Sequence, residues 1–207
     1  SLTGTDVTAS ITPARSVRFQ ASGVASATEL GTVGAPQRIG TPLVSQGAAG
    51  WERVGEAVHA YLSLPLDSLT PEQRAQAAQR LVERWAVTRS VGADALMRAG
   101  EAWSAFLEDR FPGAQQLTEQ PITWWNQDEQ VMEGWIDTLL RLPDGRIVLV
   151  DHKTYPGPEP VRHVREHYLG QLDTYSQALA AAGIPPAQVL IHLPLRGEVL
   201  EVDLEVN

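Results

Sequence analysis

From Trp51 onward, hydrophobic residues recur at the spacing of amphipathic helices. Apolar side chains at positions 54, 58, 61 and 62 fall on one helical face, and Pro65 should end this first helix. The sequence Thr70-Pro71-Glu72-Gln73 is a capping box, which marks the start of a second helix. Gly183, followed by two prolines, should end a long fourth helix. Four helices are predicted. The first begins at Trp51 and the second runs from Pro71 to about Val87. The third covers Ala93–Phe111, and the fourth covers Val161–Ala182.

Between and after these helices, the chain has short stretches that are typical of β-strands. The predicted strands are Leu117–Trp125, Val131–Leu142, Arg146–Asp151, Gln188–Leu193 and Val199–Val206. Helices followed by three strands, a helix and two strands predict a mixed α/β or α+β domain, in which helices flank a central mixed sheet. We expect residues 51–207 to form this domain.

The first 50 residues differ in composition from the rest of the chain. They carry only five charged side chains and are rich in glycine, alanine, serine, threonine and valine. Val7–Thr12 and Ser16–Phe19 could form short strands, whereas turn residues dominate between Gly31 and Gly50. Residues 1–50 are therefore predicted to be an N-terminal arm or the remnant of a preceding domain.

Two aspartates lie on the strands that flank the turn sequence of residues 143–145, Pro-Asp-Gly. In a three-residue loop, Pro and Asp form a type I turn and Gly takes the left-handed position. This loop places Asp137 directly opposite Asp151, and Lys153 shares their face. A two-residue loop would shift the register by one and place Asp137 opposite His152. The fixed φ of the proline favours the three-residue loop.

Two carboxylates this close repel each other, which raises the pKa of one of them unless a positive charge lies between. Hard divalent cations such as Mg²⁺ bind one or two protein carboxylates together with waters and substrate phosphates. A cation held by Asp137 and Asp151 would organise a water and neutralise charge on a phosphoryl oxygen, and Lys153 could orient that water. The alternative is that the aspartates are solvated residues at strand ends and that Lys153 forms a surface ion pair.

Composition narrows the chemistry further. The chain has 207 residues and a formal net charge of −9, and Lys153 is its single lysine. An acidic chain does not coat nucleic acid through its overall charge, so phosphate binding has to depend on a local site. The absence of cysteine excludes disulfides, thiolate zinc sites and cysteine-held iron–sulfur clusters. No secretory signal is evident, and no apolar run approaches the roughly 20 residues of a transmembrane helix.

Further residues could lie near the two aspartates. His59 lies beside the apolar stripe of the first helix, from which a side chain can reach the edge of the sheet. Gln171 and Tyr175 are four residues apart, so they share one face of the long helix. Glu119 lies early in the first predicted strand. Each of these residues, taken singly, is also explained by core packing or by a solvated surface position.

Taken in order, these motifs resemble those of the PD-(D/E)XK nucleases, specifically the RecB/AddA-type subfamily. The matching segments are Gly55–Leu62, Glu133–Asp137, Val150–Thr154 and Gln171–Tyr175. The resemblance covers about residues 50–206. It implies a restriction-endonuclease-like core that hydrolyses DNA phosphodiester bonds with Mg²⁺ or Mn²⁺.

The resemblance also implies a role for each motif residue. The implied metal ligands are Asp137, Asp151, the side chain of His59 and the backbone carbonyl of His152. Lys153 would position the attacking water, and it forms the catalytic set with the two aspartates. The implied supporting residues are Gln171 and Tyr175, with Glu119 as a lesser candidate whose role is open.

The sequence differs from those of some related nucleases in ways that bear on its type and its cofactors. Some members of this group carry an iron–sulfur cluster on four cysteines, and this chain has none, which favours the RecB or AddA type. A phosphate-binding loop is absent as well, so no nucleotide cofactor is expected. We expect a nuclease domain that works with a helicase domain or subunit in DNA end processing, recombination and repair, at the nucleoid in a bacterial-type cytoplasm. The alternatives are a non-catalytic DNA-binding or scaffold module and a stand-alone exonuclease.

Two remaining groups could contact DNA. Four basic or titratable residues begin the long helix directly after the metal motif, and they could bind phosphate or form a solvated face. They are Arg162, His163, Arg165 and His167. Trp124 and Trp125 could stack on bases of a single strand, although neighbouring strand residues point to opposite faces, so at least one is expected in the core.

Overall fold

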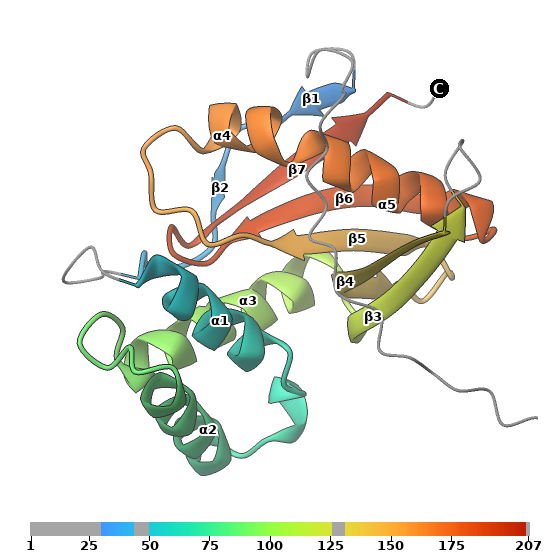
Figure 1. The fold of residues 1–207 in the computed structure, drawn as a ribbon. Helices are drawn as coiled ribbons and strands as arrows, with labels where there is room; N and C mark the ends of the chain where they lie inside the picture. The colour runs from blue at the N-terminus through green and yellow to red at the C-terminus, as the bar shows by residue number, and fades with distance from the viewer. Residues whose placement is uncertain (1–29, 44–49, 126–130, 206–207) are drawn as a thin grey trace, which may run out of the picture.

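A seven-stranded sheet with helices on both faces forms the centre of the protein (Figure 1). The computed structural model describes residues 30–43, 50–125 and 131–205. The helices are α1 (Trp51–Leu62), α2 (Pro71–Arg84), α3 (Ala93–Arg110), α4 (Pro160–His167) and α5 (Leu169–Ala181). The strands are β1 (Gly31–Val33), β2 (Gln37–Arg38), β3 (Gln115–Trp125), β4 (Val131–Arg141), β5 (Ile147–His152), β6 (Pro186–Leu193) and β7 (Glu198–Leu204).

The sheet is mixed, as the sequence predicts. Its strand order is β1-β7-β6-β5-β4-β3, and β2 also pairs with β7. Strands β5 and β6 are parallel, and the connection between them carries α4 and α5 across one face of the sheet. The other described strand pairs are antiparallel. This arrangement confirms the predicted α/β class and is consistent with a restriction-endonuclease-like core.

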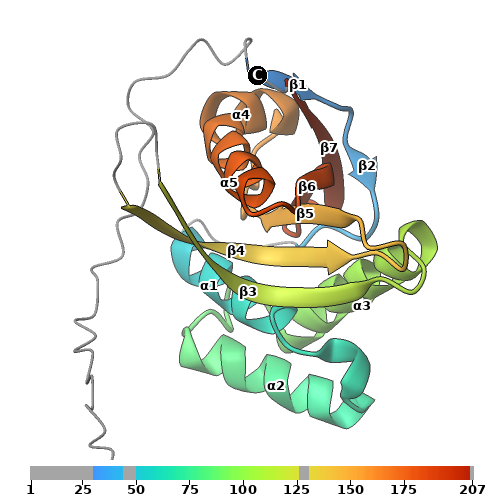
Figure 2. The same cartoon turned by 90° about the vertical axis from the view of Figure 1, so that its right-hand side faces the viewer.

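Each face of the sheet packs against its own group of helices. Helices α1, α2 and α3 lie on one face, and α4 and α5 lie on the other (Figures 1 and 2). The first core contains Trp103 of α3 together with Leu140 and Val148 of the sheet. The second core contains Leu149 of β5 and Leu172 of α5. The two helical layers therefore fix the sheet from both sides, and the candidate residues lie between them.

The register of the β4–β5 hairpin is the one set by the three-residue loop. Leu142 and Arg146 close the loop through a 2.8 Å backbone hydrogen bond, and Gly145 has a φ of 86°. The ladder then pairs Thr138 with Val150, so the next positions along, Asp137 and Asp151, face each other. The alternative register, with Asp137 opposite His152, is excluded.

The helix predicted over Val161–Ala182 is in fact two helices, which corrects that prediction. Helix α4 ends at His167 and α5 begins at Leu169, because Tyr168 leaves helical geometry with a φ of −123°. The ring of Tyr168 lies 5.0 Å from the Lys153 ammonium. A contact with a residue on another element overrides local helix propensity here, which hydrophobic spacing cannot reveal.

The segment before α1 is partly built into the sheet. Gly31–Val33 and Gln37–Arg38 both pair with β7, and Val33 and Leu43 are buried. Turn residues dominate this stretch in the sequence, yet it contributes β1 and β2. The strands considered at Val7–Thr12 and Ser16–Phe19 lie outside the described residues. None of the helices that the structure describes combines the length and apolar character needed to cross a bilayer.

Gly145 provides a test of what sets the hairpin register. A side chain at this position would meet no atom within 4 Å, so the cost of Gly145→Ala comes from its left-handed φ alone. We expect Gly145→Ala to lower the free energy of unfolding by about 1 kcal/mol in urea titrations. Gly145→Asn should cost less, because asparagine tolerates the left-handed region. Equal losses for the two variants would contradict this explanation.

Candidate metal centre

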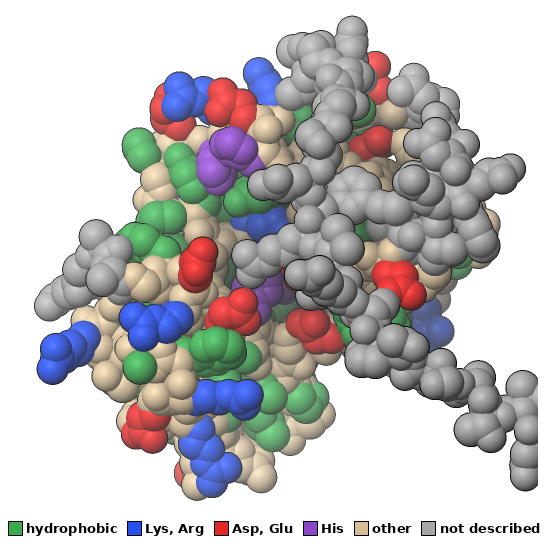
Figure 3. Space-filling view, in the orientation of Figure 1, with side chains coloured by type: hydrophobic (Ala, Val, Ile, Leu, Met, Phe, Trp, Pro, Cys, Tyr) green, Lys and Arg blue, Asp and Glu red, His purple; other side chains and the backbone are tan. Residues whose placement is uncertain are grey.

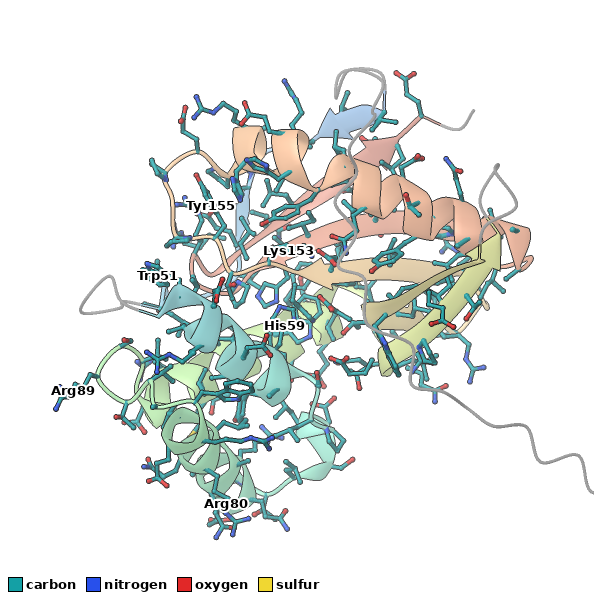
Figure 4. The ribbon with its side chains drawn as sticks, in the orientation of Figure 1. Trp51, His59, Arg80, Arg89, Lys153 and Tyr155 are labelled. Atoms are coloured by element: carbon teal, nitrogen blue, oxygen red, sulfur yellow. The ribbon has the colours of Figure 1, made fainter. Side chains whose placement is uncertain are left out.

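Four residues from three elements meet at one end of the β4–β5 pair. Asp137 lies in β4, and Asp151 lies near the end of β5, with Lys153 two residues beyond it. His59 reaches the same place from the last turn of α1. Figure 4 shows Lys153 and His59 on either side of β5. The structure therefore brings together the aspartates, the lysine and the histidine that the sequence singles out.

Asp137 links the strand to helix α1. Its Oδ2 accepts a 2.7 Å hydrogen bond from the backbone N–H of His152 and lies 3.7 Å from His59 Nδ1. The side chains of Asp137 and His59 are 19% and 29% exposed, so both are sheltered but reachable from solvent. The role predicted for the His152 carbonyl stays a prediction, because the contact seen here is made by its N–H.

Asp151 and Lys153 form a sheltered ion pair. Lys153 Nζ lies 2.8 Å from Asp151 Oδ2 and 3.1 Å from Oδ1. The Asp151 side chain is 4% exposed, and its Oδ2 makes no hydrogen bond beyond this ion pair. This buried carboxylate oxygen can therefore accept a further positive ligand. The sequence alternative of solvated strand-end residues and a surface ion pair does not hold for this pair.

The side chains of β4 change faces at Asp137. Thr138 contacts the His152 ring on the α1–α3 side, whereas Ile136 packs into the core beneath α4 and α5. Side chains two residues apart share a face on a regular strand, so the alternation breaks between these positions. Glu119 occupies the facing position in β3 and has a φ of 50°, which is rare for a residue other than glycine. This irregularity lets the Asp137 carboxylate contact both β5 and α1.

Ser63, at the end of α1, ties the helix to this irregular point. Its Oγ lies 2.9 Å from the carbonyl oxygen of His59 and 2.8 Å from Oε1 of Glu119. The Ser63 carbonyl accepts a hydrogen bond from Thr118 Oγ1. Glu119 is thus a structural neighbour of His59 through Ser63. Sequence reasoning missed Ser63, and nothing in its local sequence marks it.

Close approach at two glycines determines how the helices meet the sheet. A Cβ on Gly55 would lie 2.7 Å from Thr154 Oγ1, so a larger residue there would force the Thr154 side chain to move where α1 packs against the segment after β5. His59 is four residues further along the same helix, on the same face. A Cβ on Gly134 would lie 3.1 Å from the Tyr175 ring, which lets α5 approach β4. Both glycines belong to the motifs noted in the sequence.

Helix α5 and the residue before it form the wall above Lys153. Gln171 donates a 3.1 Å hydrogen bond to the Tyr175 hydroxyl, and Tyr168 lies over the Lys153 ammonium. Burial raises the pKa of both tyrosines, so their hydroxyls stay protonated. Tyr168 was not predicted as a site residue. Its spacing of three and seven residues before Gln171 and Tyr175 could have identified it.

A buried, uncharged layer supports the site from below. The Nδ1 atoms of His152 and His192 lie 2.9 Å apart, and Trp103 stacks on the His192 ring at 4.6 Å. Burial lowers the pKa of His152 well below its usual range and that of His192 to about 3. Both imidazoles are therefore neutral near pH 7. They fix the end of β5 without adding charge beneath Asp151.

The electrostatics of the site favour an additional cation. Burial and the charge of Asp151 raise the pKa of Asp137 to about 6, against the opposing effects of His59, Lys153 and the His152 N–H. Burial alone would lower the pKa of Lys153, but the two carboxylates outweigh it and raise the pKa. Lys153 is therefore firmly charged, and one positive charge does not fully compensate two desolvated carboxylates.

The donor set suits a hard divalent cation. Two carboxylates and one imidazole are available, and Asp151 Oδ2 makes no hydrogen bond beyond its ion pair with Lys153. Among the described residues, no three His, Cys, Asp or Glu side chains are arranged to enclose a metal ion. Carboxylate oxygens are the ligands that hard divalent cations prefer, and such cations keep part of their water shell when few protein ligands are present.

The remaining candidates have different surroundings. Arg162 is paired with Glu159 at 2.8 Å and lies 3.7 Å from Glu166, so its charge is largely balanced. Arg165 is exposed, and its role as a DNA contact stays a prediction. His163 stacks on Tyr155 at 3.8 Å. The side chains of Trp124 and Trp125 lie outside the described part of the chain.

The raised pKa of Asp137 predicts a pH-dependent stability in metal-free buffer. The carboxyl has a pKa of about 6 in the folded protein and 3.8 in the reference state, so the folded state binds its proton more tightly. Stability should therefore fall as the pH rises from about 4 to about 6. Asp137→Asn removes this loss and should raise the free energy of unfolding at pH 7 by roughly 1–3 kcal/mol in urea titrations.

Asp144 provides a control of opposite sign for this prediction. Hydrogen bonds from the backbone and side chain of Arg146 lower the pKa of this exposed carboxyl. Asp144→Asn should therefore leave stability at pH 7 unchanged or slightly reduced. A gain at pH 7 for both variants would show that general relief of negative charge, and not desolvation of Asp137, is responsible.

Comparison with known proteins agrees with this geometry. A family model described as the PD-(D/E)XK nuclease superfamily matches residues 37–204, which is most of the chain. No curated protein matches. The match spans β2 to β7 and includes both aspartates, the lysine and helix α1. The chain belongs to the PD-(D/E)XK nuclease superfamily.

Proposed function

We propose that the protein is a Mg²⁺- or Mn²⁺-dependent deoxyribonuclease of the RecB/AddA type. The observation that carries this proposal is the facing pair Asp137 and Asp151 with Lys153 on the Asp151 carboxylate. Superfamily membership implies a nuclease of the hydrolase class. The finer assignment is supported by His59 on α1 and by Gln171 and Tyr175 on α5, which stand around the same point.

The chain's own residues divide the chemistry of hydrolysis. Asp137 and Asp151 would hold the cation, with His59 beside Asp137. A divalent cation held by these residues would organise a water for attack and neutralise charge on the phosphate oxygens. Lys153 is charged and sheltered, so its ammonium can orient that water and donate hydrogen bonds to a phosphate oxygen.

Exposed positive side chains lie on the helical layer of α1 and α2, although the chain as a whole is acidic. Exposed arginines on the helical layer lie on the same side of the molecule as the site (Figure 3). The exposed arginines of α1, α2 and the loop after α2 include Arg53, Arg80, Arg84 and Arg89. Arg80 and Arg89 stand at the outer end of that layer in Figure 4. A DNA strand could use these side chains without an overall basic surface.

The biological setting of the proposal follows from the resemblance and the charge. A chain with a net charge of −9 attracts DNA weakly at long range, so delivery of a strand by a helicase domain or subunit would compensate. We therefore propose exonuclease-type action with such a partner in DNA end processing, recombination and repair, at the nucleoid. A non-catalytic scaffold of the same fold is the alternative that the next two experiments separate.

The first experiment measures cleavage. With Mg²⁺ or Mn²⁺ and linear or single-stranded DNA, Asp151→Asn and Lys153→Ala should each lower turnover at least about 100-fold, since each removes charge stabilisation of the reacting phosphate. Asp144→Asn is the matched control in the turn of the same hairpin and should cleave like the parent. Parent-like cleavage by Asp151→Asn would contradict the assigned mechanism.

The second experiment measures cation binding without catalysis. Mg²⁺ or Mn²⁺ should raise the melting temperature of the parent, because binding to the folded state alone stabilises it. The increase should disappear in Asp151→Asn and should be larger at pH 7.5 than at pH 5, where Asp137 is mostly protonated. A parent that shows no stabilisation and no calorimetric binding would favour the scaffold alternative.

A further inference from the structure

One large hydrophobic side chain is exposed beside the candidate metal centre. Trp135 is 60% exposed, and among the described residues Ile184 is the only other large hydrophobic side chain that is exposed. Trp135 lies two residues before Asp137 in β4, and its side chain lies on the strand face opposite Ile136, the side from which His59 of α1 contacts Asp137. Two residues of strand correspond to about 6.5 Å, so the backbone of Trp135 lies close to the aspartate that would hold the cation.

The distal half of the β3–β4 hairpin has one covered and one open face. Strand β5 pairs with β4 only at Thr138–Arg141, and β3 alone pairs with the rest (Figure 2). Gly134 and Ile136 face α5, with Gly134 against Tyr175 and Ile136 buried. The opposite face is exposed in both strands. Its described side chains are Glu119, Pro121, Thr123, Glu133 and Trp135.

The backbone holds Trp135 firmly on this open face. It pairs across the ladder with Pro121, which is itself exposed. The strand fixes the direction of the Trp135 side chain. The opposite face of the β3–β4 hairpin is covered by α5, so the two faces cannot exchange places. An exposed indole that is held in a fixed position provides a flat apolar surface, and binding to it costs little conformational entropy.

The charge of the open face decides which part of a nucleic acid can lie on it. Glu119 and Glu133 are exposed on this face, and no lysine or arginine is among its described side chains. Such a surface repels a phosphate backbone but accepts the neutral face of a base. A duplex presents its backbone outward, whereas an unpaired strand can turn a base onto the indole.

We propose that Trp135 is a stacking platform for an unpaired base next to the scissile phosphate, and that it favours single-stranded over duplex substrate. This inference rests on the proposed nuclease function. The base is recognised by its aromatic face, so the preference is for strandedness and not for sequence. Trp135 thus extends the site along β4 from the metal ligand Asp137 toward the substrate strand.

The test measures binding in metal-free buffer, where cleavage does not occur. Fluorescence anisotropy follows a short labelled oligothymidylate, its fully abasic counterpart and a duplex. Trp135→Ala should weaken oligothymidylate binding roughly 5- to 150-fold, and Trp135→Phe should restore most of it. Neither variant should change binding of the abasic strand. Ile184→Ala is the control, since it truncates the other exposed hydrophobic residue and should bind like the parent.

Each result has one meaning for the inference. Unchanged binding by Trp135→Ala overturns it, as does an equal loss on the abasic strand or no measurable binding of single strands by the parent. A cleavage assay with Mn²⁺ separates this from the proposed function. A parent that cleaves DNA while Trp135→Ala cuts single strands as efficiently overturns only the stacking role, whereas a parent that never cleaves overturns the nuclease proposal.

Discussion

The repulsion between two desolvated carboxylates on adjacent strands governs this structure. The hairpin turn sets Asp137 opposite Asp151, and the surrounding elements leave the two side chains only 19% and 4% exposed. The Lys153 ammonium compensates the negative charge of Asp151, and the hydrogen bond from the His152 N–H partly compensates that of Asp137. The neutral histidine pair below adds no charge of its own. A site with this residual imbalance is arranged for a cation and for the phosphate that the cation would bring.

The irregularity at Glu119 and Asp137 serves two purposes at once. On one side it directs the Asp137 carboxylate toward β5 and α1, where His59 stands. On the other side it sends Ile136 under α5 and leaves Trp135 in solvent. A regular strand pair could not direct the Asp137 carboxylate toward α1 and also place Ile136 under α5. The left-handed φ of Glu119 costs conformational energy, and the geometry that it gives the site accounts for that cost.

Much of this arrangement is predictable from the sequence, for identifiable reasons. Helix α2 begins at its capping box, and the Pro-Asp-Gly turn sets the hairpin register, because both depend on local backbone preferences. Tertiary contacts account for the misses. Tyr168 interrupts the long helix beside Lys153, Ser63 joins α1 to β3, and the strands at 31–38 form only because β7 offers them an edge. No local pattern reports contacts between distant segments.

The position of Lys153 also bears on which ions the site can retain. Its ammonium is a monovalent cation tethered to the protein, and it already occupies the Asp151 carboxylate. Any ion that enters has to compete with a counterion whose effective concentration is far above that of free salt. Sodium and potassium ions carry the same single charge as the ammonium but are not attached to the protein. Replacing the ammonium with one of them would therefore bring no gain in free energy. A doubly charged ion would have the advantage over a singly charged one in such an exchange, because its attraction to the two carboxylates is larger.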